Sequence, residues 1–74
     1  MLTLTTEGAV HAAMDRNDVT LLGLLASGLP ADSVARRLNL SPRTLRRRLR
    51  EVCDKVGAGT PIEAVAWAAR RNLI

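Results

Sequence analysis

The chain of 74 residues contains no tyrosine or phenylalanine and only one tryptophan, Trp67. Proteins that read single-stranded nucleic acid stack its bases on several aromatic side chains, so this composition argues against that class. The longest mostly apolar run covers residues 21–26, well below the roughly 18–20 residues that cross a bilayer. Because the first 15 residues carry no positively charged run, we expect no secretory signal.

Cysteine and histidine each occur once, as Cys53 and His11. A single cysteine excludes an internal disulfide and a zinc site built on several cysteines, and it fits the reducing cytoplasm, where we expect the protein to reside. Neither residue has partners at the spacing of a metal site or a catalytic pair. We therefore interpret His11 as a polar surface residue and Cys53 as a small core residue, and we predict no enzymatic activity, metal or cofactor.

Basic charge, by contrast, is abundant and confined to one segment. Eleven basic residues face seven acidic ones, and ten of the eleven are arginine. Residues 36–50 contain seven arginines and no acidic residue, whereas the rest of the chain is nearly balanced or slightly acidic. Such a segment is typical of a protein that binds a polyanion. The alternative, a solvated helix face, would normally mix charges of both signs.

Capping residues divide the chain into short helices and predict an all-α fold. Asp15 and Asp18 form an acidic version of the capping box, so a first helix is expected over about residues 16–27. Residues 6–13 have the composition of a short additional helix, although Gly8 weakens it. We therefore divide the chain into an N-terminal extension, residues 1–13, and one domain, residues 14–74.

Three more helices follow in this domain. Pro30 is expected to start a short second helix that Asn39 ends, since asparagine tolerates the left-handed conformation. Ser41 precedes a proline at the first helical position and predicts a third helix over residues 42–56. A full capping box then predicts a fourth helix over about residues 61–71.

The third helix has two faces of different chemistry. Its apolar residues recur at helical spacing, as do its arginines, and at 100° per residue the two stripes point roughly 130° apart. The apolar stripe is Leu45, Leu49, Val52 and Val56, and the basic stripe is Arg43, Arg46, Arg47 and Arg50. A short helix, a turn and a longer basic helix predict a helix-turn-helix whose recognition helix is residues 42–56.

This arrangement predicts binding of double-stranded DNA. The major groove admits one helix, and arginine can donate two hydrogen bonds to guanine or hold a phosphate. Ser41 and Thr44, with the first amides of the helix, are suited to a backbone phosphate, and we interpret Arg48 as a flanking phosphate contact or an acid-paired residue. The alternative function is a helical adaptor for an acidic protein such as RNA polymerase or a sigma or anti-sigma factor.

The last helix is apolar on two sides and therefore needs two neighbours. We expect one side to pack in the core, namely Ile62, Val65, Ala66, Ala69 and Leu73. The other side is expected to contact a second copy of the chain, because a domain of this size offers only one neighbour and tryptophan is a common interface anchor. The predicted dimer interface is Ala64, Trp67, Ala68 and Arg71.

Several short motifs follow one another in a fixed order from Met14 to the end of the chain. They are Leu21-Leu22-Gly23-Leu24-Leu25-Ala26-Ser27-Gly28, Val34-Ala35-Arg36-Arg37-Leu38-Asn39-Leu40-Ser41, Thr44-Leu45-Arg46-Arg47-Arg48, Lys55-Val56-Gly57, Glu63-Ala64-Val65 and Leu73-Ile74. Together they resemble the LuxR-type helix-turn-helix, also called the GerE or NarL/FixJ type, over 61 of the 74 residues.

The resemblance implies a bacterial transcription regulator of four helices that binds DNA as a homodimer. It also implies that Arg46, Arg47 and Arg50 face the major groove, that Thr44 meets a phosphate and that the last helix makes the dimer contact. The chain departs from the family at Pro30, which replaces a serine cap, and at Arg48, which replaces a histidine. Family domains usually follow a larger regulatory domain, so the chain is either a free-standing regulator, which Met1 slightly favours, or an excised piece.

Overall fold

The computed structural model describes residues 14–74, and within this range it contains four helices and no strand. The helices are α2 (Arg16–Ala26), α3 (Ala31–Arg37), α4 (Pro42–Val56) and α5 (Pro61–Arg70). The all-α prediction is confirmed, and α4 has the bounds that its capping residues predict. The N-terminal extension and the short helix expected over residues 6–13 lie outside the described residues.

Two aspartates begin α2 as the sequence predicts. The Asp18 amide donates to Asp15 Oδ1 at 2.8 Å, and the Asp15 amide donates to Asp18 Oδ2 at 3.3 Å. These bonds satisfy backbone donors that the first turn of a helix leaves without partners. At the other end, Gly28 has a φ of 94°, a left-handed conformation in which a residue with a Cβ atom would be strained.

Pro30 takes a different position from the one expected. Its φ of −62° suits a helix, but its ψ of 155° is extended, so it precedes the first helical residue and α3 begins at Ala31 without a side-chain cap. The end of α3 follows the prediction, because Asn39 adopts a left-handed φ of 58°. This turn allows the Leu40 amide to donate to the Ala35 carbonyl at 2.8 Å and directs the chain into α4.

Side-chain caps also begin α4 and α5. The Thr44 amide donates to Ser41 Oγ at 3.1 Å, and the Glu63 amide donates to Thr60 Oγ1 at 3.2 Å. The capping box of α5 differs slightly from the predicted form, because the Glu63 carboxylate accepts from the amide of Gly59, one residue before the cap. Both helix starts are therefore held by bonds between neighbours in the sequence.

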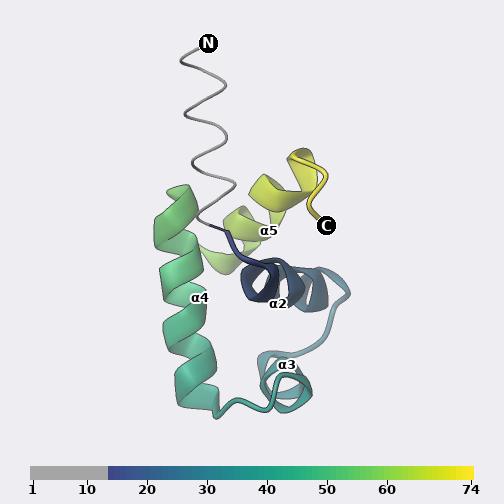
Figure 1. Ribbon diagram of the computed structural model, residues 1–74, viewed down its shortest axis with the longest axis vertical. Helices are drawn as coiled ribbons and strands as arrows, with labels where there is room; N and C mark the ends of the chain where they lie inside the picture. Colours follow the sequence, from purple (N-terminus) through teal and green to yellow (C-terminus); the bar gives the residue numbers. More distant parts are fainter. Residues whose placement is uncertain (1–13) are drawn as a thin grey trace.

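The buried side chains of the described residues form one small core, and Figure 1 shows how the four helices are arranged. α4 runs along one side of the molecule and packs against α3 and α5, while α2 packs against these same two helices. The largest side chains at the centre are fully buried, and every one of these helices except α5 contributes to them: Leu21, Leu22, Val34, Leu45 and Val52. Since Leu45 and Val52 belong to the apolar stripe of α4, burial of that stripe leaves the opposite, basic side of the helix in solvent.

α5 packs into the core mainly with the opposite side from the one predicted, although Val65 and Leu73 of the predicted side also pack against the core. Ala64 and Ala68 are fully buried in the core, whereas Ile62, expected in the core, is 79% exposed. The two alanines are small, so their side of the helix fits closely against α2 and α4. The expectation that Ala64 and Ala68 face a second copy is therefore corrected, because neither has surface left to offer a partner.

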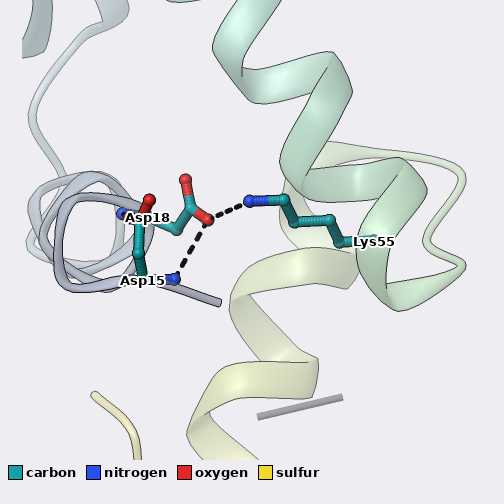
Figure 2. A network of polar contacts seen from close by, with 3 residues as sticks. All are labelled: Asp15, Asp18 and Lys55. Atoms are coloured by element: carbon teal, nitrogen blue, oxygen red, sulfur yellow. Dashed lines mark hydrogen bonds and ion pairs between the residues drawn. The ribbon is translucent and has the colours of Figure 1, made fainter. Parts of the chain in front are cut away.

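An ion pair that the sequence analysis did not anticipate links the start of α2 to the end of α4. Lys55 Nζ lies 2.6 Å from Asp18 Oδ2, the oxygen that also accepts from the Asp15 amide (Figure 2). The Asp18 side chain is 10% exposed and that of Lys55 is 33% exposed. The hydrogen bond to Asp18 raises the pKa of Lys55 above its ordinary value of 10.5. Asp18 thus caps α2 and fixes α4 at the same time.

Lys55→Met should destabilise the domain at neutral pH by about 1–2 kcal/mol, because it leaves the carboxylate of Asp18 with one partner fewer. A folded-state pKa above the unfolded value gives a contribution that is complete below pH 10.5 and is lost as pH rises through the raised pKa. Urea denaturation of both proteins at neutral and strongly alkaline pH measures this difference. If the difference in free energy of unfolding between the two proteins is the same at a pH above the raised pKa, this role of the ion pair is contradicted.

Candidate nucleic-acid interface

The basic stripe of α4 forms a continuous surface on the side of the helix away from the core. A shallow hollow of about 500 Å³ is lined by four arginines and one threonine: Arg43, Thr44, Arg46, Arg47 and Arg50. All four arginines are exposed, and they belong to successive turns of one helix. The structure therefore gathers the arginines of the predicted stripe around one surface.

These arginines have no acidic partner in the part of the chain that the structure describes. Among residues 14–74 the only ion pair is that between Lys55 and Asp18. An arginine guanidinium keeps its charge at any physiological pH and carries five donors in a planar fork. The hollow consequently presents concentrated positive charge and many free donors, which suit phosphate oxygens and the acceptor edge of guanine.

Ser41 and Thr44 lie at the start of α4, next to this surface. Ser41 Oγ accepts from the Thr44 amide and donates to Thr44 Oγ1 at 3.0 Å. The hydroxyl of Thr44 accepts this bond and keeps its own proton available for a further acceptor. Thr44 is thus the better placed of the two to donate to a phosphate, while Ser41 acts as the helix cap.

Arg48 points to a different place from the other arginines of α4. It is half-buried and lines a second hollow, of about 220 Å³, whose other walls come from α2 and from the turn before α4: Asn17, Asp18, Leu21, Leu38 and Leu40. Although Asp18 shares this hollow, its ion pair is with Lys55. The structure therefore does not pair Arg48 with an acidic residue, and this part of the prediction is wrong.

Cys53 is a core residue, as predicted, with 8% of its surface exposed. Burial, and then the negative charges of Asp54 and Glu63, raise the pKa of its thiol above the ordinary value of 9.0. A protonated buried thiol is a poor nucleophile. Residues 14–74 bring together no group of three or more histidine, cysteine or acidic side chains that could hold a metal ion.

None of the helices in the described range is both long enough and apolar enough to span a bilayer.

The exposed side of α5 contributes an apolar surface that the sequence analysis missed. A hollow of about 330 Å³ lies between the end of α2 and the start of α5, lined by Leu25, Ala26, Pro61, Ile62 and Val65. None of these five side chains is charged. The two apolar stripes of α5 were visible in the sequence, but nothing local indicated which of them would face solvent.

Trp67 and Arg71, the other two residues of the predicted interface, contact each other. The guanidinium carbon of Arg71 lies 4.3 Å from the centre of the Trp67 ring, and Arg71 Nη1 donates to the Trp67 carbonyl at 3.5 Å. Both residues are half-buried, and Trp67 packs against the core. Their contact with a second copy stays a prediction.

Comparison with known proteins gives two matches, and both are to regulatory proteins. A helix-turn-helix family model described as bacterial regulatory protein, Fis family, matches residues 32–51, which span most of α3, the turn and the first part of α4. Over 61 residues the chain is 31% identical to the transcriptional regulatory protein YdfI of Bacillus subtilis (strain 168). That match includes 82% of this chain but 29% of the relative, so the chain spans less than a third of the relative's length. No solved structure shows significant similarity.

Proposed function

Since the chain contains a helix-turn-helix similar to that of bacterial regulatory proteins, we propose that it binds double-stranded DNA sequence-specifically as a transcription regulator. The observation that carries the proposal is the row of four exposed arginines on α4, which have no acidic partner among the described residues. α3 and α5 pack against α4, and burial of its apolar side leaves this row in solvent.

The dimensions of DNA favour α4 as the recognition helix. The major groove is about 12 Å wide and admits one α-helix, whose first turns usually contact the bases. In this pose Arg46, Arg47 and Arg50 reach base edges, and Arg43 and Thr44 reach phosphates on either side. The order of the sequence motifs further supports a LuxR-type domain within the broader helix-turn-helix class.

Binding to duplex DNA should weaken steeply as salt rises. Each phosphate that a basic side chain neutralises contributes about −0.9 to the slope of log K against log salt, so several contacts give a slope steeper than about −4. Fluorescence anisotropy with a labelled duplex from a selected random library measures this slope. An affinity for duplex DNA that does not change with salt, together with tight binding to an acidic protein, would contradict the proposal. The chain would then be an adaptor whose partner is RNA polymerase or a sigma or anti-sigma factor.

We propose that the active form is a homodimer that uses the exposed side of α5. The uncharged hollow around Ile62 supports a second copy as the occupant, and so do the charges that flank it. Glu63 and Arg70 lie on one side of α5, near its opposite ends, and both are exposed. In a two-fold antiparallel contact, Glu63 of each copy approaches Arg70 of the other, so the surface is complementary to itself.

Ile62→Glu should abolish cooperative binding to a duplex with two half-sites and leave binding to a single half-site unchanged. The added carboxylate would be buried without a partner at the contact, whereas in the monomer the position is 79% exposed and tolerates charge. Gel-shift titrations on the two duplexes measure both effects, and Thr20→Glu, at another exposed position, is the control. Cooperativity that survives in Ile62→Glu would move the dimer contact elsewhere, for instance to Trp67 and Arg71.

A further inference from the structure

Arg48 is a half-buried cation without an acidic partner in the described residues. Three leucines wall its hollow, from α2 and from the turn before α4: Leu21, Leu38 and Leu40. A guanidinium partly removed from water by apolar walls gains more from an anion than an exposed one does, because less water competes for its donors. The hollow is open, and Asn17 adds a side-chain amide to its rim.

The one acidic residue that lines this hollow is already bound to other groups. Asp18 lines the same hollow, yet its Oδ2 accepts from Lys55 Nζ at 2.6 Å and from the Asp15 amide at 3.3 Å (Figure 2). Lys55 approaches Asp18 from the last turn of α4, whereas Arg48 lies two turns earlier on the same helix. The lysine thus neutralises the one carboxylate that lines the hollow, and Arg48 keeps its donors free.

We infer that Arg48 and Asn17 form a second anion site, beside the arginine row, which takes one phosphodiester group of the duplex backbone. The inference rests on the proposed function, because it assumes that the row occupies the major groove. On that assumption, we place one strand beside the start of α2, where Asn17 and Arg48 line this hollow. Lys55 acts as a positioning residue, since it withholds Asp18 from Arg48.

The first test compares the salt dependence of duplex binding for wild type, Arg48→Ala and Arg48→Lys. Loss of one phosphate contact should make the slope of log K against log salt shallower by about 0.9 per bound chain. Base preference in a library selection should stay the same, because a phosphate contact carries no direct sequence information. Arg48→Lys should recover most of the slope, since it restores the charge. Asn17→Ala should lower affinity without changing the slope, because it removes a neutral donor.

The second test asks whether Lys55 keeps Arg48 free. In Lys55→Met the carboxylate of Asp18 should turn to Arg48. The slope of log K against log salt should then become as shallow as in Arg48→Ala, and the double variant should have the same slope. Asp18→Asn in the Lys55→Met background should restore the wild-type slope, because the hollow then contains no carboxylate and the amide oxygen can still accept from the Asp15 amide. Arg70→Met, with the same charge change on α5, is the matched control when binding is read on a single half-site duplex, where no dimer contact contributes.

The outcomes separate the two proposals. If wild type fails to bind any duplex, the proposed function fails and this site fails with it. If wild type binds and Arg48→Ala leaves the slope unchanged, or alters base preference, this site alone is refuted. Competition by millimolar inorganic phosphate distinguishes the source of the anion: we expect it to leave affinity unchanged beyond its ionic strength, and specific displacement would overturn the assignment to a duplex phosphate. If Lys55→Met does not fold, the same salt dependence is measured for Lys55→Gln, and its slope tests the positioning role of Lys55.

Discussion

Arg47→Ala and Arg50→Ala are each expected to weaken binding to a single half-site duplex by about 1–3 kcal/mol, or roughly 5- to 150-fold. Both side chains are exposed on the outer side of α4, line the same hollow and have no acidic partner among residues 14–74. Each can therefore donate two hydrogen bonds to guanine, and alanine leaves that base edge without its partner. Anisotropy titrations against the selected duplex and its single-base variants give both the loss in affinity and the position at which preference relaxes.

Arg70→Ala is the control for these two variants. It removes the same charge from another helix, and on a single half-site no dimer contact contributes, so it should change affinity far less. Circular dichroism of all three variants should match wild type, because every one of these side chains is exposed. An effect of Arg70→Ala as large as that of Arg47→Ala would mean that the bound surface is not the outer side of α4.

Leu45→Ala should destabilise the domain by about 2–5 kcal/mol and unfold much of the population. Leu45 is 1% exposed, and it lies on the side of α4 that packs against the body of the domain. Small domains have little stability in reserve, since native proteins are stable by about 5–15 kcal/mol and the shortest lie near the lower limit. Urea denaturation followed by circular dichroism measures the loss.

Leu49→Ala, one turn further along α4, is the matched variant. Leu49 is only half-buried, so its truncation leaves a smaller cavity and should cost clearly less than that of Leu45. Duplex binding should fall in Leu45→Ala in proportion to the unfolded fraction, because the arginines themselves are untouched. Equal losses in both variants would mean that α4 is held on the domain by contacts other than its apolar stripe.

The helices of this chain were predictable where local rules decide them. Ser41 and Pro42 mark the start of α4, Gly57 marks its end, and both signals depend only on neighbouring residues. The separation of leucines from arginines on α4 follows from the helical repeat, and burial in the structure agrees with it. For the same reason the candidate DNA surface could be named from sequence: the arginines share one face as soon as the segment is a helix.

The features that sequence did not reveal depend on which segments meet in space. α5 carries two apolar stripes, and the choice of Ala64 over Ile62 for the core depends on how closely α2 and α4 approach it. The pairing of Lys55 with Asp18 joins residues 37 positions apart, and no local pattern indicates it. The position of Arg48 outside the basic stripe follows from the helical repeat, but the hollow that it lines exists only because residues of α2 and of the turn before α4 lie beside it.

The burial of Cys53 makes it a natural reporter of transient opening. It is the only cysteine of the chain, it lies near the end of α4, and its pKa is raised in the folded state. Little of its surface is exposed, at the wall of a hollow that Arg46 and Arg50 also line, so a thiol reagent should label opened molecules faster than closed ones. The faster component then follows the population of opened molecules when reclosing is fast. The free energy that holds α4 in place can thus be followed in the unmodified protein, at working concentration and without an added probe.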